Sequence, residues 1–151
     1  PSRLADGYSR AACEATLAAN LLRAADFFAG TGIRLCCEAI NDLDMPGFLL
    51  RTPDEVVALL ARVPAADIAL QIDLYHAARM NLSIPAMLAR HLSRTAHIQF
   101  ADNPGRHEPG TGEINFPFLF RHLRTIGYAG WIGCEYVPSG PTEDSFEWMA
   151  T

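Results

Sequence analysis

Residues 68–76 read Ile-Ala-Leu-Gln-Ile-Asp-Leu-Tyr-His, and this stretch decides how the rest of the chain is interpreted. It opens as a short apolar run, which is typical of a strand buried on both faces in a parallel sheet. The run ends at Asp73, and His76 follows three residues later. A carboxylate and a histidine at the end of a buried strand indicate a binding site, because burying such groups without a partner costs free energy.

Three other apolar segments also end at a polar side chain, and we interpret all four as strands. Residues 33–37 run into Glu38, residues 95–98 run into Gln99, and residues 131–134 run into Glu135. Helix signals separate the segments, and strands that alternate with helices predict parallel βαβ units. The strand ends are therefore expected to bring Glu38, Asp73, Gln99 and Glu135 to one place.

The predicted helices cover residues 9–29, 52–62, 83–92 and 117–126, and a final short helix begins near residue 142. The start of the second is the clearest, because Thr52 can cap it, Pro53 suits its first turn and Glu55 completes a capping box. Residues 101–115 form a polar segment with three glycines and two prolines. A connection of this length predicts a functional loop.

Two architectures fit this order of elements, an open doubly wound sheet or part of a (β/α)8 TIM barrel. In an open sheet a ligand contacts few strands, at one switch point. Polar ends on four successive strands favour the barrel, in which every strand ends at the same mouth. A whole barrel has eight strands in about 250 residues. We therefore expect residues 1–151 to form a single α/β domain, the C-terminal half of a barrel with about four βα units.

Composition and charge argue against several classes of protein. The chain has 151 residues and a formal net charge of -5, whereas nucleic-acid partners usually require a basic face. No apolar run approaches the ~20 residues of a membrane span, and no signal peptide is visible. Cys36, Cys37 and Cys134 fall in predicted strands. We expect them to be buried thiols of a cytoplasmic protein rather than disulfides or zinc ligands.

The polar strand ends form a candidate metal site. Their side chains offer only oxygen, which suits Mg²⁺ or Mn²⁺, whereas zinc usually recruits nitrogen or sulfur. Three carboxylates gathered without a cation would repel one another, and at least one would take up a proton. The alternative is that each acid caps a helix or pairs with an arginine. Four equivalent positions favour the metal site.

Three cationic or titratable residues are candidates for substrate binding. His76 follows Asp73 in what we predict to be a loop at the same mouth, although a lone histidine is often structural. Arg106 and His107 lie in the long loop after Gln99, where they can hold an anionic or hydroxyl-bearing substrate. The alternative for that segment is a solvated turn.

Six short motifs resemble the hydroxypyruvate isomerase family, which belongs to the xylose-isomerase-like TIM barrels. They are Cys-Glu-Ala-Ile-Asn at 37–41, Gln-Ile-Asp-Leu-Tyr-His at 71–76, His-Ile-Gln at 97–99, Pro-Gly-Arg-His-Glu-Pro at 104–109, Gly-Glu-Ile-Asn at 112–115 and Gly-Cys-Glu-Tyr at 133–136. The resemblance implies that Glu38 and Glu135 are paired catalytic glutamates that also bind the metal. It further implies that Asp73 and Gln99 complete the ligand set and that His76 and Arg106 contact substrate.

This resemblance implies an isomerase that interconverts hydroxypyruvate and tartronate semialdehyde with the help of Mg²⁺ or Mn²⁺. One glutamate would remove a proton beside the carbonyl to give an enediolate, and the other would serve on the opposite side. Arg106, with His107 nearby, would pair with the substrate carboxylate. The expected partner is thus a small hydroxy-carbonyl acid or a sugar, with no nucleic acid and no membrane.

Several alternatives remain open at this point. A ketose 3-epimerase or an inosose dehydratase uses the same barrel, although Gln99 stands where epimerases generally carry histidine. A DNA-repair enzyme resembling endonuclease IV would want several zinc ions and more histidine ligands. A non-catalytic binding domain would have no need of both Glu38 and Glu135.

The missing strands generate a first prediction. Four parallel strands alone would leave two open edges and an uncovered inner face. We therefore expect that the 151 residues do not persist as an isolated monomer, and that they belong to a longer chain or pair as a homo-oligomer. We favour the longer chain, because a dimer would crowd two sets of acids at one mouth. Light scattering and mass spectrometry test this, and a monodisperse monomer near 16.5 kDa with a cooperative thermal transition would contradict it.

Overall fold

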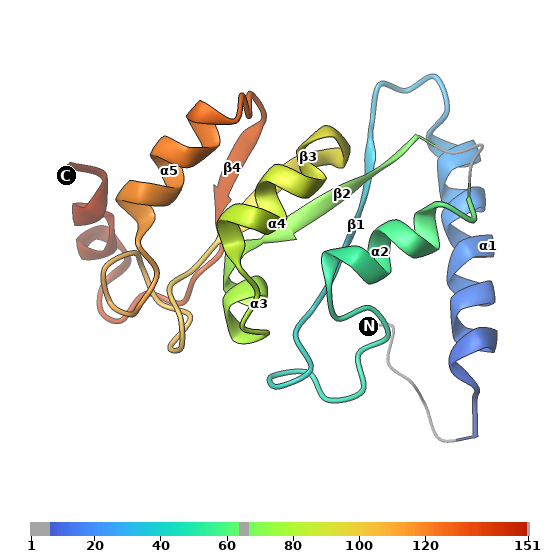
Figure 1. Cartoon of the computed structure of the whole chain (residues 1–151), viewed down its shortest axis with the longest axis horizontal. Helices are drawn as coiled ribbons and strands as arrows, with labels where there is room; N and C mark the ends of the chain where they lie inside the picture. Colours follow the sequence, from blue (N-terminus) through green and yellow to red (C-terminus); the bar gives the residue numbers. More distant parts are fainter. Residues whose placement is uncertain (1–6, 64–66, 151) are drawn as a thin grey trace.

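Figure 1 shows the computed structural model of the chain, which describes residues 7–63 and 67–150. Four parallel strands form one sheet in the order β1-β2-β3-β4. They are β1 (Leu35–Glu38), β2 (Ile68–Asp73), β3 (Thr95–Phe100) and β4 (Trp131–Cys134). The four predicted strands and their alternation with helices are confirmed.

Helices connect the strands and pack on one face of the sheet (Figure 1). They are α1 (Arg10–Phe28), α2 (Pro53–Leu60), α3 (Leu74–Arg79), α4 (Ile84–His91) and α5 (Phe116–Thr125), with the short 3-10 segments η1 (Leu92–Arg94) and η2 (Thr142–Ala150). The predicted cap of α2 is confirmed, because the Thr52 hydroxyl accepts the amide hydrogen of Glu55 at 3.4 Å.

The hydrophobic core lies between the sheet and the helices. Leu70 and Ile72 of β2 and Ile98 and Phe100 of β3 are at most 2% exposed. They belong to one cluster with apolar side chains of α2, α4 and α5, namely Val56, Leu59, Leu88, Leu119 and Leu123. Because side chains alternate along a strand, these residues face the helices while their neighbours face the other way. Each such burial stabilises the fold by about 1.5–3 kcal/mol.

The face of the sheet turned away from the helices is polar and open, in agreement with the expectation that four strands alone leave an inner face uncovered. Only β2, the strand for which burial on both faces was expected, keeps most of its side chains buried. Gln71 and His97, which pair across β2 and β3, are half-buried, and Trp131 of β4 is 84% exposed. The expectation of buried thiols is wrong for Cys36 and Cys134. Cys36 is exposed on this open face and Cys134 is exposed on β4 at the edge of the sheet, whereas Cys37 is buried against the helices.

An additional helix begins directly after β2, and it corrects the prediction that His76 lies in a loop. Asp73 ends the strand and caps α3, because its Oδ1 accepts the amide hydrogen of Tyr75 at 2.8 Å. His76 is 4% exposed on this helix. The sequence did not indicate this helix, because Asp73 is both the last residue of β2 and the N-cap of α3.

The register of the sheet brings the polar strand ends to one edge. Glu38 pairs with Gln71, and Asp73 pairs with Gln99. The amide of Glu135 continues the pairing beyond β4, because it donates to the carbonyl of Phe100 at 3.0 Å. All four predicted positions therefore lie at the carboxyl ends of adjacent strands. Within residues 7–63 and 67–150, no helix is both long and apolar enough to span a membrane.

Candidate active site

Glu38, Asp73 and His76 form the centre of the site. Each offers one potential ligand atom, and these atoms all lie within 4.8 Å of one another. Glu38 comes from the end of β1, Asp73 from the end of β2 and His76 from the first turns of α3. Parallel pairing of β1 and β2 thus brings together residues that are 35 or more positions apart in the chain.

Burial and mutual repulsion perturb the two carboxyl groups. Burial, together with the charges of Asp73 and Glu135, raises the pKa of Glu38 to about 7. Burial raises the pKa of Asp73 to about 6, although the amide of Tyr75 and the charge of Arg106 oppose that shift. Oε1 of Glu38 and Oδ2 of Asp73 are buried and have no hydrogen-bond partner. Buried oxygens without partners are rare, and here they fit a cation or a polar ligand.

Arg106 is the cation nearest to the acids. Its guanidinium lies 3.6 Å from Oδ2 of Asp73 and 3.4 Å from Oε2 of Glu135, and 5.0 Å above the ring of Tyr75. Its backbone has a φ of 58°, which residues other than glycine rarely adopt. Two hydrogen bonds hold this backbone, one from its amide to the carbonyl of Asp102 and one from the amide of Val137 to its own carbonyl.

Gln99 lies beside the cluster and is held by a residue that the sequence interpretation missed. The side-chain amide of Gln71 donates to Oε1 of Gln99 and also hydrogen-bonds Glu38. Gln71, on β2, thereby joins two predicted metal ligands that lie on the two flanking strands, β1 and β3. Its position two residues before Asp73, on the same face of β2, was the signal available in the sequence.

His107 has a different setting from the other predicted site residues. Its Nδ1 donates to the carbonyl of Val137 at 2.6 Å, and so joins the loop after β3 to the segment after β4. Glu108 makes a second connection of this kind, because its carboxylate accepts from the amide and the hydroxyl of Ser139. A role for His107 in substrate binding stays a prediction.

Asp102 organises the loop that carries Arg106, and sequence reasoning did not identify it. The side chain is buried, and its two oxygens accept four backbone amide hydrogens at 2.9–3.0 Å. The donors are Asn103, Gly110, Gly112 and Ile114. Gly112 is required by this packing, because a Cβ there would lie 2.1 Å from the carbonyl oxygen of Asn103.

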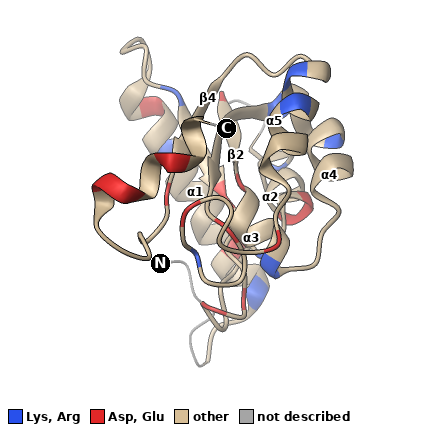
Figure 2. Cartoon of the chain, turned by 90° about the vertical axis from the view of Figure 1, so that its left-hand side faces the viewer, with Lys and Arg blue, Asp and Glu red and all other residues tan. Residues whose placement is uncertain are grey.

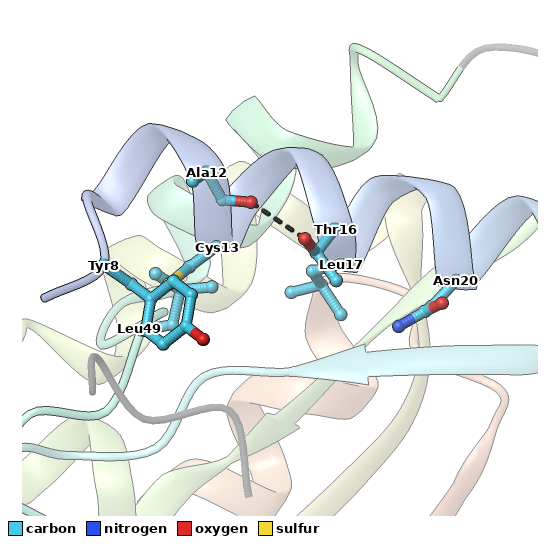
Figure 3. Close-up of a pocket in the computed structure, with 7 residues that line it drawn as sticks. All are labelled: Tyr8, Ala12, Cys13, Thr16, Leu17, Asn20 and Leu49. Atoms are coloured by element: carbon cyan, nitrogen blue, oxygen red, sulfur yellow. Dashed lines mark hydrogen bonds between the residues drawn. The ribbon is translucent and has the colours of Figure 1, made fainter. Parts of the chain in front are cut away.

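A groove of about 370 Å³ lies apart from these residues, between α1 and Leu49 (Figure 3). Its walls are mostly apolar, and the hydroxyl of Thr16 in its wall donates to the carbonyl of Ala12 within the helix. Cys13 and Leu17 line the groove and also pack against the core. The groove therefore lacks the convergent polar groups that distinguish the strand ends.

The role of Asp102 can be tested by removing its charge. Asp102→Asn keeps the shape but directs an NH₂ group at backbone amides, so the free energy of unfolding should fall by about 1.5–3 kcal/mol. Urea unfolding of the intact protein measures it. Asp67→Asn is the matched control, because that side chain is 82% exposed in a surface ion pair and should change stability by less than about 0.5 kcal/mol. Equal unfolding midpoints for the two variants would contradict the role of Asp102.

Several known proteins are similar to this chain in sequence and in fold. The family model described as xylose isomerase-like TIM barrel matches residues 1–151. A 2-oxo-tetronate isomerase of Cupriavidus necator is 41% identical over 140 residues, which cover 93% of this chain and 54% of that protein. The hydroxypyruvate isomerase of Escherichia coli is 39% identical over 143 residues, which cover 95% of this chain and 55% of that protein. The chain spans about half the length of the curated relatives it matches.

A solved structure shows the same arrangement of elements. The crystal structure described as AP endonuclease, family 2, from Brucella melitensis has a TM-score of 0.91 and 41% identity, and the match covers 96% of this chain and 56% of that one. The expected resemblance to hydroxypyruvate isomerases is thus confirmed by the relatives, and the expected barrel by the family match. The chain belongs to the xylose isomerase-like TIM barrel family and forms four βα units of such a barrel.

Proposed function

We propose that this chain carries the catalytic strand ends of an isomerase that acts on small 2-oxo-3-hydroxy acids. The reaction would interconvert hydroxypyruvate and tartronate semialdehyde, or the related pair formed from 2-oxo-tetronate. The observation that carries the proposal is the meeting of half-buried Glu38 and buried Asp73 with Glu135 and Arg106 at one edge of the sheet. The names of the two relatives support the substrate class.

The residues present fit a divalent cation. Oε1 of Glu38 and Oδ2 of Asp73 are buried oxygens without hydrogen-bond partners. Burial and neighbouring negative charges raise the pKa of both carboxyl groups, and a bound cation would offset those effects. Glu38, Asp73, Gln99 and Glu135 would hold the ion through oxygen, a donor set that suits Mg²⁺ or Mn²⁺. When bound, the ion would act as a Lewis acid toward the carbonyl of the substrate.

The two glutamates would move the proton. Interconversion of a 2-oxo-3-hydroxy acid with its 2-hydroxy-3-oxo isomer removes a proton from C3, forms an enediolate and returns a proton to C2. The hydroxyl proton passes between the two oxygens, so the formula does not change. A carboxylate within hydrogen-bond reach of the reacting carbon can take this proton, and Glu38 lies at the centre of the site. Glu135 is half exposed, pairs with Arg106 and would serve as the counterpart of Glu38.

Arg106 would recognise the carboxylate of the substrate. Its guanidinium already pairs with Asp73 and Glu135. A cation held by those acids would satisfy them and release Arg106 to make charge-assisted hydrogen bonds with an anionic substrate. The stacking of Arg106 on Tyr75 and the strained backbone held by the loop place this charge before the substrate arrives.

An endonuclease is the second candidate, because the Brucella melitensis structure carries that description. The charges of the site disfavour it, since Glu38, Asp73 and Glu135 surround Arg106 and would repel a phosphate backbone unless several cations were bound. Basic residues of α4 and α5 lie on the helical layer instead, as Figure 2 shows. Abasic-site DNA therefore belongs in the assay as a second substrate.

The test is an assay of the intact protein with Mg²⁺ or Mn²⁺. We expect interconversion of hydroxypyruvate and tartronate semialdehyde, with slower or no reaction of ketoses, inososes and abasic DNA. Glu135→Gln should lower kcat about 100-fold or more, because a catalytic acid or base is lost without a change of shape. The control is Glu147→Gln on η2, which is exposed and should leave kcat unchanged. Turnover of abasic DNA alone, or a normal kcat in Glu135→Gln, would contradict the proposal.

Metal binding should depend on pH because of the raised pKa values. Below about 7 Glu38 holds a proton, and below about 6 Asp73 also holds one, so a cation must displace them. We expect the affinity for Mn²⁺ to weaken as pH falls from 7.5 to 5.5, by up to about tenfold per pH unit for each displaced proton. Calorimetry in two buffers of different ionisation enthalpy measures both the affinity and the protons released. Equal affinity at both ends of this range would show that these carboxyl groups do not hold the ion.

A further inference from the structure

Asn41, at the start of the loop after β1, is a fully buried side chain whose hydrogen-bonding capacity is completely used. Its Oδ1 accepts the amide hydrogens of Leu43 at 3.1 Å and Asp44 at 2.8 Å. Its Nδ2 donates to Oδ2 of Asp44 at 3.0 Å and lies 2.7 Å from Nδ1 of His76. A side-chain amide has two donors and two acceptor sites, and all four are engaged.

The orientation of the Asn41 amide follows from these contacts. If the amide were turned by 180°, its NH₂ group would face two backbone N–H donors, and its oxygen would face the carboxylate of Asp44. That arrangement would replace attractive contacts with repulsive ones, so Nδ2 must point at His76. Nδ1 of His76 can then only accept a hydrogen bond, and a neutral imidazole with this pattern carries its proton on Nε2.

The contact with Asn41 also keeps the His76 ring neutral, because a doubly protonated imidazole would direct a second donor from Nδ1 at the NH₂ group of Asn41. Nε2 faces the acids, at 3.7 Å from Oδ2 of Asp73. Asp44, which accepts a hydrogen bond from Asn41, is itself attached to α3. Its carboxylate accepts from the hydroxyl of Tyr75 at 2.5 Å and pairs with Arg79 at 3.0 Å.

We infer that Asn41 is a positioning residue that holds His76 as an Nε2–H donor directed into the site. A nitrogen that carries a proton cannot offer a lone pair to a cation, so His76 is kept out of the metal's ligand set although its ring lies within reach of it. The donor is instead available for an oxygen of the substrate. This use of His76 rests on the proposed function, whereas the position of the proton does not.

A purely structural role for Asn41 must be distinguished from this one, because the same side chain also closes the turn to Asp44. Asn41→Asp separates the two. The remaining Oδ1 still accepts the amide hydrogens of Leu43 and Asp44. The second oxygen faces both Nδ1 of His76 and the carboxylate of Asp44, so a proton on Nδ1 is needed to offset the added negative charge. Asp44→Asn is the control, because it removes the charge next to Asn41 while the backbone amides still fix the Asn41 orientation.

Nitrogen-15 NMR of the intact protein, labelled in its histidine rings, shows at pH 7 which ring nitrogen carries the proton. The two nitrogens resonate far apart when only one of them is protonated. The His76 signals are identified by their loss in His76→Gln. We expect a protonated Nε2 and an unprotonated Nδ1 in the unmodified protein and in Asp44→Asn, and a protonated Nδ1 in Asn41→Asp. A protonated Nδ1 in the unmodified protein overturns the inference, and this spectrum decides even if Asn41→Asp fails to fold.

Activity provides an independent readout. If the proposed function is correct, Asn41→Asp should lower kcat/KM for hydroxypyruvate about 10–100-fold, as is typical when a residue behind a site is changed. If Nδ1 of His76 is protonated in Asn41→Asp but kcat/KM is unchanged, the assignment of Asn41 as a positioning residue is overturned. If the proton lies where we infer but no variant turns over any hydroxy-carbonyl acid, the proposed function fails and the assignment of the proton stands.

Discussion

Parallel pairing of β1, β2, β3 and β4 forces the carboxyl ends of these strands to one edge of the sheet, and this constraint places Glu38, Asp73 and Glu135 within range of one another's charge. Such an arrangement raises the free energy of the folded chain unless a positive charge or protons compensate it. The hydrophobic core that holds the strands in register therefore also keeps these carboxylates close together in spite of their repulsion. Arg106 relieves part of that repulsion, and burial together with the remaining negative charge still raises the pKa values of Glu38 and Asp73.

Two buried polar side chains outside the cluster of acids fix the orientation of residues in the site. Asp102 gathers four backbone amides and so shapes the loop that carries Arg106, and Asn41 uses its whole amide to orient His76. Neither residue touches the place where a substrate would react. Each is valuable because a buried polar group with every hydrogen bond satisfied permits one orientation, and all others leave a donor or acceptor without a partner. Precise placement of Arg106 and His76 thus depends on residues outside the cluster of acids.

The sheet has two chemically different faces, and this difference relates the fold to the function we propose. The helical face is a continuous apolar core, whereas the open face carries Gln71, His97 and the exposed Trp131. In a complete barrel of this family the open face would line the interior, beneath the acids. The four βα units described here thus bring the proposed ligands and both glutamates from one continuous stretch of chain, although it spans about half the length of its relatives.

The sequence alone determined the order of the elements, the barrel-type fold and the group of polar strand ends, because alternating strands and helices and the residue at the end of each strand are local properties. It did not reveal α3, since Asp73 ends one element and begins the next. It predicted an uncovered inner face but wrongly treated Cys36 as buried, because the face that a strand residue takes depends on what packs against the sheet. Gln71, Asp102 and Asn41 were missed for a related reason. The contacts of Gln71 with Gln99 and of Asn41 with His76 exist only once the strands lie side by side, and those of Asp102 exist only once the loop after β3 folds around its side chain.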